Sequence, residues 1–336
     1  MKQVLLTGAS HGLGRNAATF LAEEGVAYRG VGRSADALTQ LPGQLIAPMA
    51  VDLTQLAPAD YAPLLAGCDT VWHCAALSSP WGRYQDFYAI NFSATERLAE
   101  AAGRQGVARF VHVSTPSVYF DYQHRHQIKE TFCAQRLPNH YAQTKWLAEG
   151  AIQRAAQAYP DTRYVILRPR AIFGPHDRVL LPRVWARLRQ QQGLLRLPRG
   201  GATLMDFTYV ANVVQALSLA STQPNIASGS VFNISNQEPW TLAEVLGALF
   251  GQLAEPYGVR AVPYGVVKTV AQLSELGAWA TGRAPALTRY GAGTLNYDMT
   301  LCPLRAQQQL GYVPQVNMAE AIAHTAFWLG EHGYDD

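Results

Sequence analysis

The sequence predicts an α/β protein with a doubly wound parallel sheet and a smaller, mostly C-terminal α/β domain. An apolar run at residues 4–6 is followed by a glycine-rich turn and then by a helical segment, which is how such a sheet begins. Strand-like and helical segments then alternate through the first half of the chain. The chain has 336 residues, of which 49% are hydrophobic and 15% charged. It is therefore expected to be globular, with one large domain or two domains in close contact.

The individual elements are predicted in order from apolar runs and capping residues. Asn139 is expected to cap a helix over 140–158, and Thr241 with Glu244 forms a capping box for a later helix. The other expected helix covers 16–22, and the expected strands lie at 4–6, 27–31, 70–76, 110–115 and 232–235.

Composition and charge exclude several classes of function. A net charge of only +3 gives no support for nucleic-acid binding. No apolar run approaches the ~20 residues that a membrane span needs, and the N-terminus leaves no room for a signal peptide. Four scattered cysteines lack the spacing of a metal site, so we expect no metal and a reduced, cytoplasmic protein.

The turn after the first strand has the composition of a dinucleotide-binding loop. Glycine allows the backbone to approach a pyrophosphate, and the following helix N-terminus favours its negative charge. The alternative is a tight turn that binds nothing. The cofactor-binding residues predicted here are Gly8, Ser10, His11, Gly12, Leu13 and Gly14.

The end of the second strand bears on the choice of cofactor. An NAD site usually has a carboxylate here for the ribose hydroxyls, and none is present. Arg33 is expected to pair with a 2′-phosphate, with Ser34 adding a hydroxyl. The alternative is that Arg33 is a solvated loop residue. We therefore expect NADP as the preferred cofactor and NAD as the alternative.

Tyr141 and Lys145 are four residues apart on the expected helix and share a face. A phenol with a pKa near ~10 is a poor base at neutral pH, but a nearby ammonium favours the phenolate. Such a tyrosine can protonate a forming alkoxide or remove the proton in reverse. Thr115, at the end of an expected strand, is expected to hold the carbonyl oxygen. The alternative is a packed tyrosine beside a solvated lysine.

These motifs together resemble the extended short-chain dehydrogenase/reductases, the NAD(P)-dependent epimerase/dehydratase family, and within it the 3β-hydroxysteroid dehydrogenase-like branch. The glycine spacing, Gly-x3-Gly-x-Gly, resembles the superfamily but does not identify the branch. The matching segments are 7–14, 73–76, 91–95, 113–119, 141–145, 167–175, 207–214 and 310–314.

The resemblance implies the fold and further site residues. It implies a Rossmann-type domain at 1–174 plus about 205–235, and a substrate-binding domain at about 175–204 plus 236–336. It places Thr115 in the catalytic Ser/Thr position, Lys145 on the nicotinamide ribose, and Asn91 in support of the active site. The cofactor contacts it implies are Asp52 with Leu53 at the adenine, Cys74, Ala75 and Ala76 along the cofactor, and Pro169, Ala171 and Ile172 beside the carboxamide.

Two departures from the family pattern bear on the reaction. Phe120 replaces a common glycine, and Pro116 with Ser117 replaces the acidic pair typical of sugar-nucleotide dehydratases. Simple oxidoreduction is therefore favoured over dehydration. The residues expected to contact substrate are Trp81, Tyr84, Thr115, Ser117 and Tyr290.

Residues 163–199 contain nine arginines, balanced within that span only by Asp177. They indicate either an anion site, for a nucleotide diphosphate or coenzyme A, or a solvated helix face from which one or two arginines reach the substrate.

Three functions follow as hypotheses. The main one is an NADP-preferring oxidoreductase that interconverts a ketone and a secondary alcohol on a largely apolar small molecule, steroid-like or of β-keto/β-hydroxy type. The alternatives are a sugar-nucleotide epimerase with tightly bound NAD, and a non-catalytic NADP sensor that binds a partner protein. A homodimer through the helices near 91–103 and 140–158 is expected from the resemblance.

Overall fold

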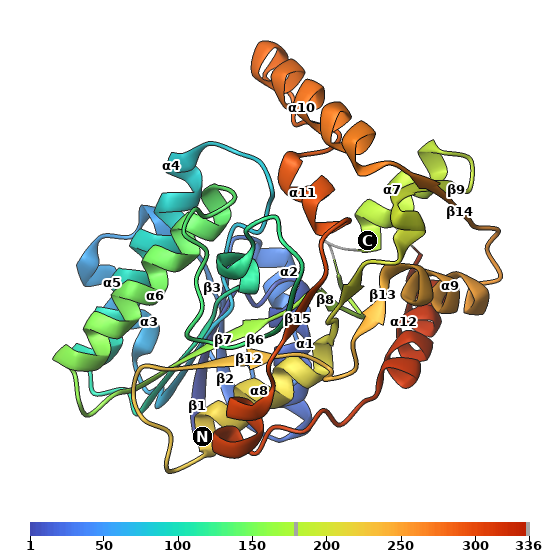
Figure 1. Cartoon of the computed structure of the whole chain (residues 1–336). Helices are drawn as coiled ribbons and strands as arrows, with labels where there is room; N and C mark the ends of the chain where they lie inside the picture. Colours follow the sequence, from blue (N-terminus) through green and yellow to red (C-terminus); the bar gives the residue numbers. More distant parts are fainter. Residues whose placement is uncertain (178–180, 334–336) are drawn as a thin grey trace.

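The computed structural model describes residues 1–177 and 181–333. Its largest sheet has seven parallel strands in the order β12-β7-β5-β4-β1-β2-β3 (Figure 1). The order reverses beside β1, as in doubly wound folds. The strands are β1 (Gln3–Thr7), β2 (Ala27–Gly32), β3 (Met49–Ala50), β4 (Thr70–His73), β5 (Arg109–Val113), β7 (Arg163–Pro169) and β12 (Ser230–Ile234). The predicted fold class is confirmed.

Helices cover both faces of this sheet, which explains why its strands are continuous apolar runs. Successive residues of β1 point to opposite faces: Val4 and Leu6 pack in one core cluster and Leu5 in the other. The first cluster is closed by α1 (Gly12–Glu23) and α8 (Val210–Thr222), the second by α3 (Tyr61–Leu65), α5 (Ala94–Arg104) and α6 (His140–Ala158).

The rest of the chain builds a second, smaller layer with its own apolar core. A four-stranded sheet has the order β13-β10-β15-β6, and two strand pairs, β11-β8 and β14-β9, accompany it. Strand β6 falls within 1–174 yet lies in this second sheet. The strands are β6 (Arg125–Ile128), β8 (Ile172–Phe173), β9 (Leu194–Pro198), β10 (Leu204–Met205), β11 (Thr208–Tyr209), β13 (Trp240–Thr241), β14 (Gly258–Val262) and β15 (Met299–Leu301).

The remaining helices surround that layer or link the strands. They are α2 (Ala35–Thr39), α4 (Tyr84–Phe87), α7 (Leu181–Gln190), α9 (Leu242–Gln252), α10 (Tyr264–Thr281), α11 (Arg289–Thr294) and α12 (Met318–His332). In Figure 1, α10 projects from the body of the molecule. No helix in the described ranges is long and apolar enough to cross a bilayer.

Capping residues set the helix boundaries as predicted in two cases. The Asn139 side chain accepts a hydrogen bond from the Ala142 amide at 2.8 Å, and α6 begins at the next residue. Thr241 and Glu244 form the reciprocal capping box of α9. Helix α1 begins earlier than predicted, at Gly12, so that the last two glycines of the turn fall within its first turn.

Candidate active site

The carboxyl ends of β1 and β4 define the crevice where dinucleotides bind in doubly wound sheets. The two ends are joined by the side chain of Thr7. Its hydroxyl lies 2.7 Å from His73 Nδ1 and accepts a hydrogen bond from the Ala75 amide at 3.2 Å. The turn after β1 and the small residues after β4 are therefore held together at this crevice.

The glycine turn fits a bound pyrophosphate. A Cβ on Gly8 would come within 2.9 Å of the Ala75 backbone, and one on Gly14 within 2.0 Å of the Gly8 carbonyl oxygen. At Gly12, which has a left-handed φ of 51°, an added Cβ would be in van der Waals contact with the His176 carbonyl oxygen at 3.7 Å. His11, the N-cap residue of α1, makes no side-chain capping bond, and the first turn has no acidic residue. The amides at this helix start are thus free of a side-chain cap and suit an anion.

Two further turn residues are packed in place. Ser10 is buried with its hydroxyl against Gly32, where an added Cβ would approach within 2.2 Å. Leu13 is half-buried against both main core clusters. These contacts fix the turn to the ends of the strands.

The residues expected at the adenosine end lie after β2 and β3. Arg33 is exposed. The Ser34 hydroxyl accepts from the Ala37 amide at 3.2 Å and caps α2. Asp52 Oδ1 accepts from the amide and hydroxyl of Thr54, and Leu53 is buried. Ser34 and one oxygen of Asp52 thus already have local partners.

The residues expected along the nicotinamide half lie after β4 and β7. Burial raises the pKa of the Cys74 thiol to about 12, so it stays protonated and is a poor nucleophile. Ala75 is half-buried and Ala76 is exposed. Pro169 ends β7, Ala171 adopts a left-handed φ of 45°, and Ile172 begins β8.

Tyr141 sits in the first turn of α6, with its phenol near the side chains of Thr115 and Ser78. Burial raises the pKa of the phenol, and the two neighbouring hydroxyls lower it by a smaller amount. The Thr115 hydroxyl donates to Ser117 Oγ at 3.0 Å, and Ser117 Oγ lies 2.8 Å from the Tyr290 hydroxyl. A chain of four hydroxyls therefore runs from Tyr141 to Tyr290, which we call the hydroxyl cluster.

Lys145 is buried one turn further along α6. Its Nζ donates to the Val113 carbonyl at 2.7 Å and lies 2.9 Å from His112 Nε2. Burial lowers the pKa of Lys145 to about 7, against the opposing effects of Glu149 and Cys74. The groups that lower the pKa of Tyr141 are thus the hydroxyls of Thr115 and Ser78. The Lys145 amine instead donates a hydrogen bond to β5.

Asn91 connects the loop after β4 to α6. Its Oδ1 accepts from the Leu77 amide at 2.8 Å, and its Nδ2 donates to the Leu77 carbonyl and to Thr144 Oγ1, both at 3.2 Å. Asn91 lies in a π-helical turn, residues Tyr88–Ser93, of a kind often found at functional sites. It thereby fixes the loop that carries Ser78.

The expected substrate residues do not all come together. Thr115, Ser117 and Tyr290 belong to the hydroxyl cluster. Trp81 contacts Trp279 of α10, with ring centroids 5.7 Å apart. Tyr84 is exposed and packs on Tyr88 and His140, so it gives no sign of lining the same site.

Three residues near the site were not singled out from the sequence. They are Ser78, His112 and Arg170. A histidine within an apolar strand was the available signal for His112, which is buried beside His73 with ring centroids 5.4 Å apart. Ser78 lies in a loop and shows no such signal. Arg170 was grouped with the other arginines.

The nine arginines do not form one site. Arg168 is paired with Glu149, Arg199 with Asp298, and Arg163 donates to the Pro224 carbonyl. Arg178 and the side chain of Arg183 lie outside the described residues.

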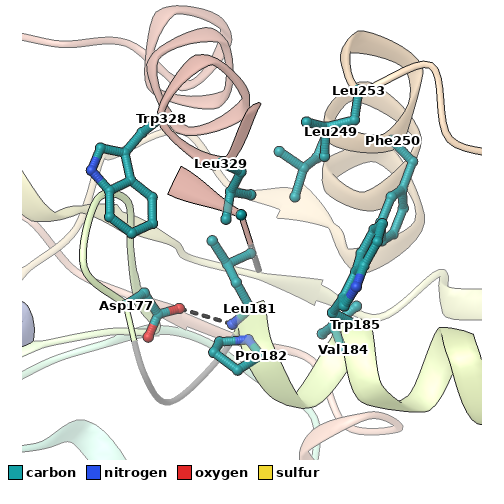
Figure 2. Close-up of a pocket in the computed structure, with 11 residues that line it drawn as sticks. Asp177, Leu181, Pro182, Val184, Trp185, Leu249, Phe250, Leu253, Trp328 and Leu329 are labelled. Atoms are coloured by element: carbon teal, nitrogen blue, oxygen red, sulfur yellow. Dashed lines mark hydrogen bonds between the residues drawn. The ribbon is translucent and has the colours of Figure 1, made fainter. Parts of the chain in front are cut away.

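A pocket between α7, α9 and α12 is separate from this site (Figure 2). Apolar side chains dominate its lining, among them Trp185, Phe250 and Leu329. Asp177, its acidic residue, accepts from the Leu181 amide at 2.8 Å. None of the predicted site residues lines it. We interpret it as a hollow of the second core with no catalytic group.

A family model described as "NAD dependent epimerase/dehydratase family" matches residues 4–235. The chain is 42% identical to the uncharacterized protein YbjS of Escherichia coli K12, over 98% of each chain. It is 31% identical to the 2-alkyl-3-oxoalkanoate reductase of Stenotrophomonas maltophilia, over 95% of this chain and 97% of that one. It is 30% identical to the decarboxylating sterol-4-alpha-carboxylate 3-dehydrogenase of Homo sapiens, over 79% and 73%.

Solved structures show the same fold. The UDP-glucuronic acid 4-epimerase of Bacillus cereus, in complex with NAD, superposes with a TM-score of 0.76 over 98% of this chain and 99% of that one. Sequence identity is 19%. At that identity the similarity concerns the fold alone.

Proposed function

Because the chain belongs to the NAD-dependent epimerase/dehydratase family and is an oxidoreductase of the extended short-chain dehydrogenase/reductase type, we propose that it interconverts a ketone and a secondary alcohol on a largely apolar substrate. The observation that carries this proposal is the contact of Tyr141, one helical turn before the buried Lys145, with the neighbouring hydroxyls of Thr115 and Ser78 at the carboxyl edge of the sheet. That contact joins a proton donor to two groups that orient a substrate oxygen.

The chain's own residues handle the proton. When bound, the nicotinamide cofactor supplies or accepts the hydride. In reduction, Tyr141 gives its phenolic proton to the substrate oxygen, so that the carbonyl gains one hydride and one proton. In oxidation, the same phenol takes the proton back. Thr115 would orient the oxygen, and Lys145, held by Val113, would bind the nicotinamide ribose.

The substrate class is supported by two relatives. One is named for reducing a 2-alkyl-3-oxoalkanoate and the other for dehydrogenating a sterol carboxylate at C3. We propose a substrate of the same β-oxo or β-hydroxy type. Neither name identifies the substrate of this chain.

NADP is the proposed cofactor, with NAD as the alternative. Arg33 follows β2 and is exposed, so it can pair with a 2′-phosphate. The glycine turn and α1 would hold the pyrophosphate, and Asp52 would bind the adenine amino group through the oxygen that Thr54 leaves free.

The test is a panel of 3-hydroxy acids, sterols and simple ketones, each with NADP and NAD in both directions. Turnover of an alcohol or ketone, abolished in Tyr141→Phe, is the expected result. Turnover of a UDP-sugar alone, or of no compound by pure and folded protein, contradicts the proposal.

The two alternative functions have less support. The epimerase hypothesis depended on the arginine-rich segment, several of whose arginines are paired within the protein. Purification with bound NAD(H) and stabilisation by a UDP-sugar would restore it. The sensor hypothesis does not explain the hydroxyl cluster, and a Tyr141→Phe variant with full cellular function would favour it.

We further propose a homodimer through α5 and α6, which pack side by side. Trp146 and Leu147 of α6 are 41% and 38% exposed, which gives this face apolar area to bury. Light scattering should show a dimer that Leu147→Glu converts to a monomer. A monomeric wild-type protein at high concentration contradicts the proposal.

A further inference from the structure

Arg170 is a buried guanidinium with nitrogens that lack partners. It is only 9% exposed, and among the described residues its Nε and Nη2 have no hydrogen-bond partner. These two nitrogens form one edge of the planar group, the edge that receives both oxygens of a carboxylate in a bidentate pair. Burying a charge without such partners is costly. The unpaired edge of Arg170 therefore indicates a binding site for an anionic ligand.

Arg168, two residues earlier, shows how the same edge of a guanidinium binds a carboxylate. Its Nε donates to Glu149 Oε1 at 2.9 Å, and its Nη2 donates to the other carboxylate oxygen. Its Nη1 donates to the Tyr119 hydroxyl and the Glu130 carbonyl. The two arginines are similarly buried, but Arg168 has a carboxylate from the protein and Arg170 has none.

Arg170 also lies beside the hydroxyl cluster. It follows the carboxyl end of β7, which pairs with β5, and Thr115 follows the end of β5. Burial lowers the pKa of the Arg170 guanidinium, and Tyr290 and Asp206 are close enough to raise it in part. Asp206 does not fill the free edge, since its Oδ2 accepts from the Leu301 amide at 2.6 Å and the two Arg170 nitrogens stay unbonded.

We propose that Arg170 binds the carboxylate of the substrate, and that the substrate is a 3-oxo or 3-hydroxy carboxylic acid. Tyr141 and Thr115 then act on the oxygen at C3, while the carboxylate at C1 pairs with the free edge of the guanidinium. This inference rests on the proposed function and names its substrate class. A phosphate dianion fits less well, because Asp206 repels a second negative charge.

The experiment compares oxidation of 3-hydroxydecanoate with that of 3-hydroxydecanamide, which has the same shape and no charge. Wild-type enzyme is expected to favour the acid by on the order of 100-fold in kcat/KM. Arg170→Met should lower kcat/KM for the acid far more than for the amide, mainly through KM, so that the preference is lost. Arg170→Lys should restore part of it, since lysine keeps the charge but not the bidentate edge.

Equal use of acid and amide by the wild type, or a preference that survives in Arg170→Met, overturns the role of Arg170 and leaves the proposed function standing. If neither compound is oxidised, the substrate panel described above tests the proposed function. Calorimetric binding of both compounds to Tyr141→Phe with oxidised cofactor then decides on Arg170 without turnover. Tighter binding of the acid than of the amide to Tyr141→Phe, with loss of this difference in Tyr141→Phe/Arg170→Met, supports the role of Arg170. Equal binding of the two compounds to Tyr141→Phe overturns that role, even if Arg170→Met does not fold.

Discussion

Ser117 Oγ and the Tyr290 hydroxyl lie 2.8 Å apart, and this contact joins the loop after β5 to α11 at the edge of the second layer. The ring of Tyr290 packs edge-on against Phe120, with centroids 5.3 Å apart. Residues separated by 173 positions in the chain thus meet at the candidate active site. The part of the chain outside the large sheet thereby supplies a hydroxyl to the hydroxyl cluster.

Tyr290→Phe keeps the aromatic contact and removes that hydroxyl. Loss of one hydrogen bond at a substrate site is worth roughly 1.4 kcal/mol, so kcat/KM should fall about tenfold, with most of the change in KM. Steady-state kinetics on the turned-over substrate provide the measurement. Tyr84→Phe is the matched control, because Tyr84 is exposed and packs on Tyr88 and His140. Equal effects of the two substitutions would remove Tyr290 from the site.

Tyr141→Phe removes the proposed proton donor. Loss of a general acid costs about 10²- to 10⁴-fold in rate, and kcat is expected to fall by that factor. Cofactor affinity, measured by fluorescence titration, should change little. A variant that retains wild-type kcat would show that another group moves the proton.

The sequence indicated the residues whose role depends on local spacing. Asn139, Tyr141 and Lys145 lie on one helix, and their order along it was sufficient to predict the cap and the shared face. The partners of Lys145 were not predictable in this way, because His112 and Val113 come from a strand more than thirty residues earlier. Arg168 and Arg170 look alike in sequence, and only the fold shows that Glu149 is bound to the first and not to the second.

The buried amine of Lys145 should make the stability of the cofactor-free protein depend on pH. The pKa of Lys145 is lowered to about 7 in the folded state, from 10.5 in its ordinary state. Between these values the unfolded chain binds a proton that the folded chain does not, so this group raises the free energy of unfolding as pH increases. The contribution is lost as pH falls through 7.

Denaturant unfolding of wild type and Lys145→Met from pH 7 to 10 tests this. The difference between the two proteins should grow in favour of the wild type by up to about 1.4 kcal/mol per pH unit. Parallel curves would mean that the folded-state pKa of Lys145 is not lowered.

Arg168→Met leaves Glu149 buried without its cation. Arg168 and Glu149 are 2% and 3% exposed, so screening by solvent is small. Breaking a buried pair from one side costs about 3–5 kcal/mol, and the free energy of unfolding should fall by that amount. Adding Glu149→Gln should recover part of the loss, because it removes the unpaired charge. Arg170→Met is the matched control, since it removes a guanidinium that has no carboxylate partner, and it should cost much less in stability. Similar losses in both variants would contradict the distinction between the two arginines.

Arg33→Asp tests the cofactor preference. Arg33 is exposed after β2, where a carboxylate would bind the ribose hydroxyls of NAD and repel a 2′-phosphate. The ratio of kcat/KM for NADP to that for NAD is expected to fall by on the order of 100-fold. Ser34→Ala is the control, because the Ser34 hydroxyl already caps α2 through the Ala37 amide. That variant should lose about 1 kcal/mol of stability and keep the cofactor ratio nearly unchanged. If Arg33→Asp does not change the ratio of kcat/KM for NADP to that for NAD, Arg33 does not contact the 2′-phosphate. The proposed preference for NADP then loses its basis.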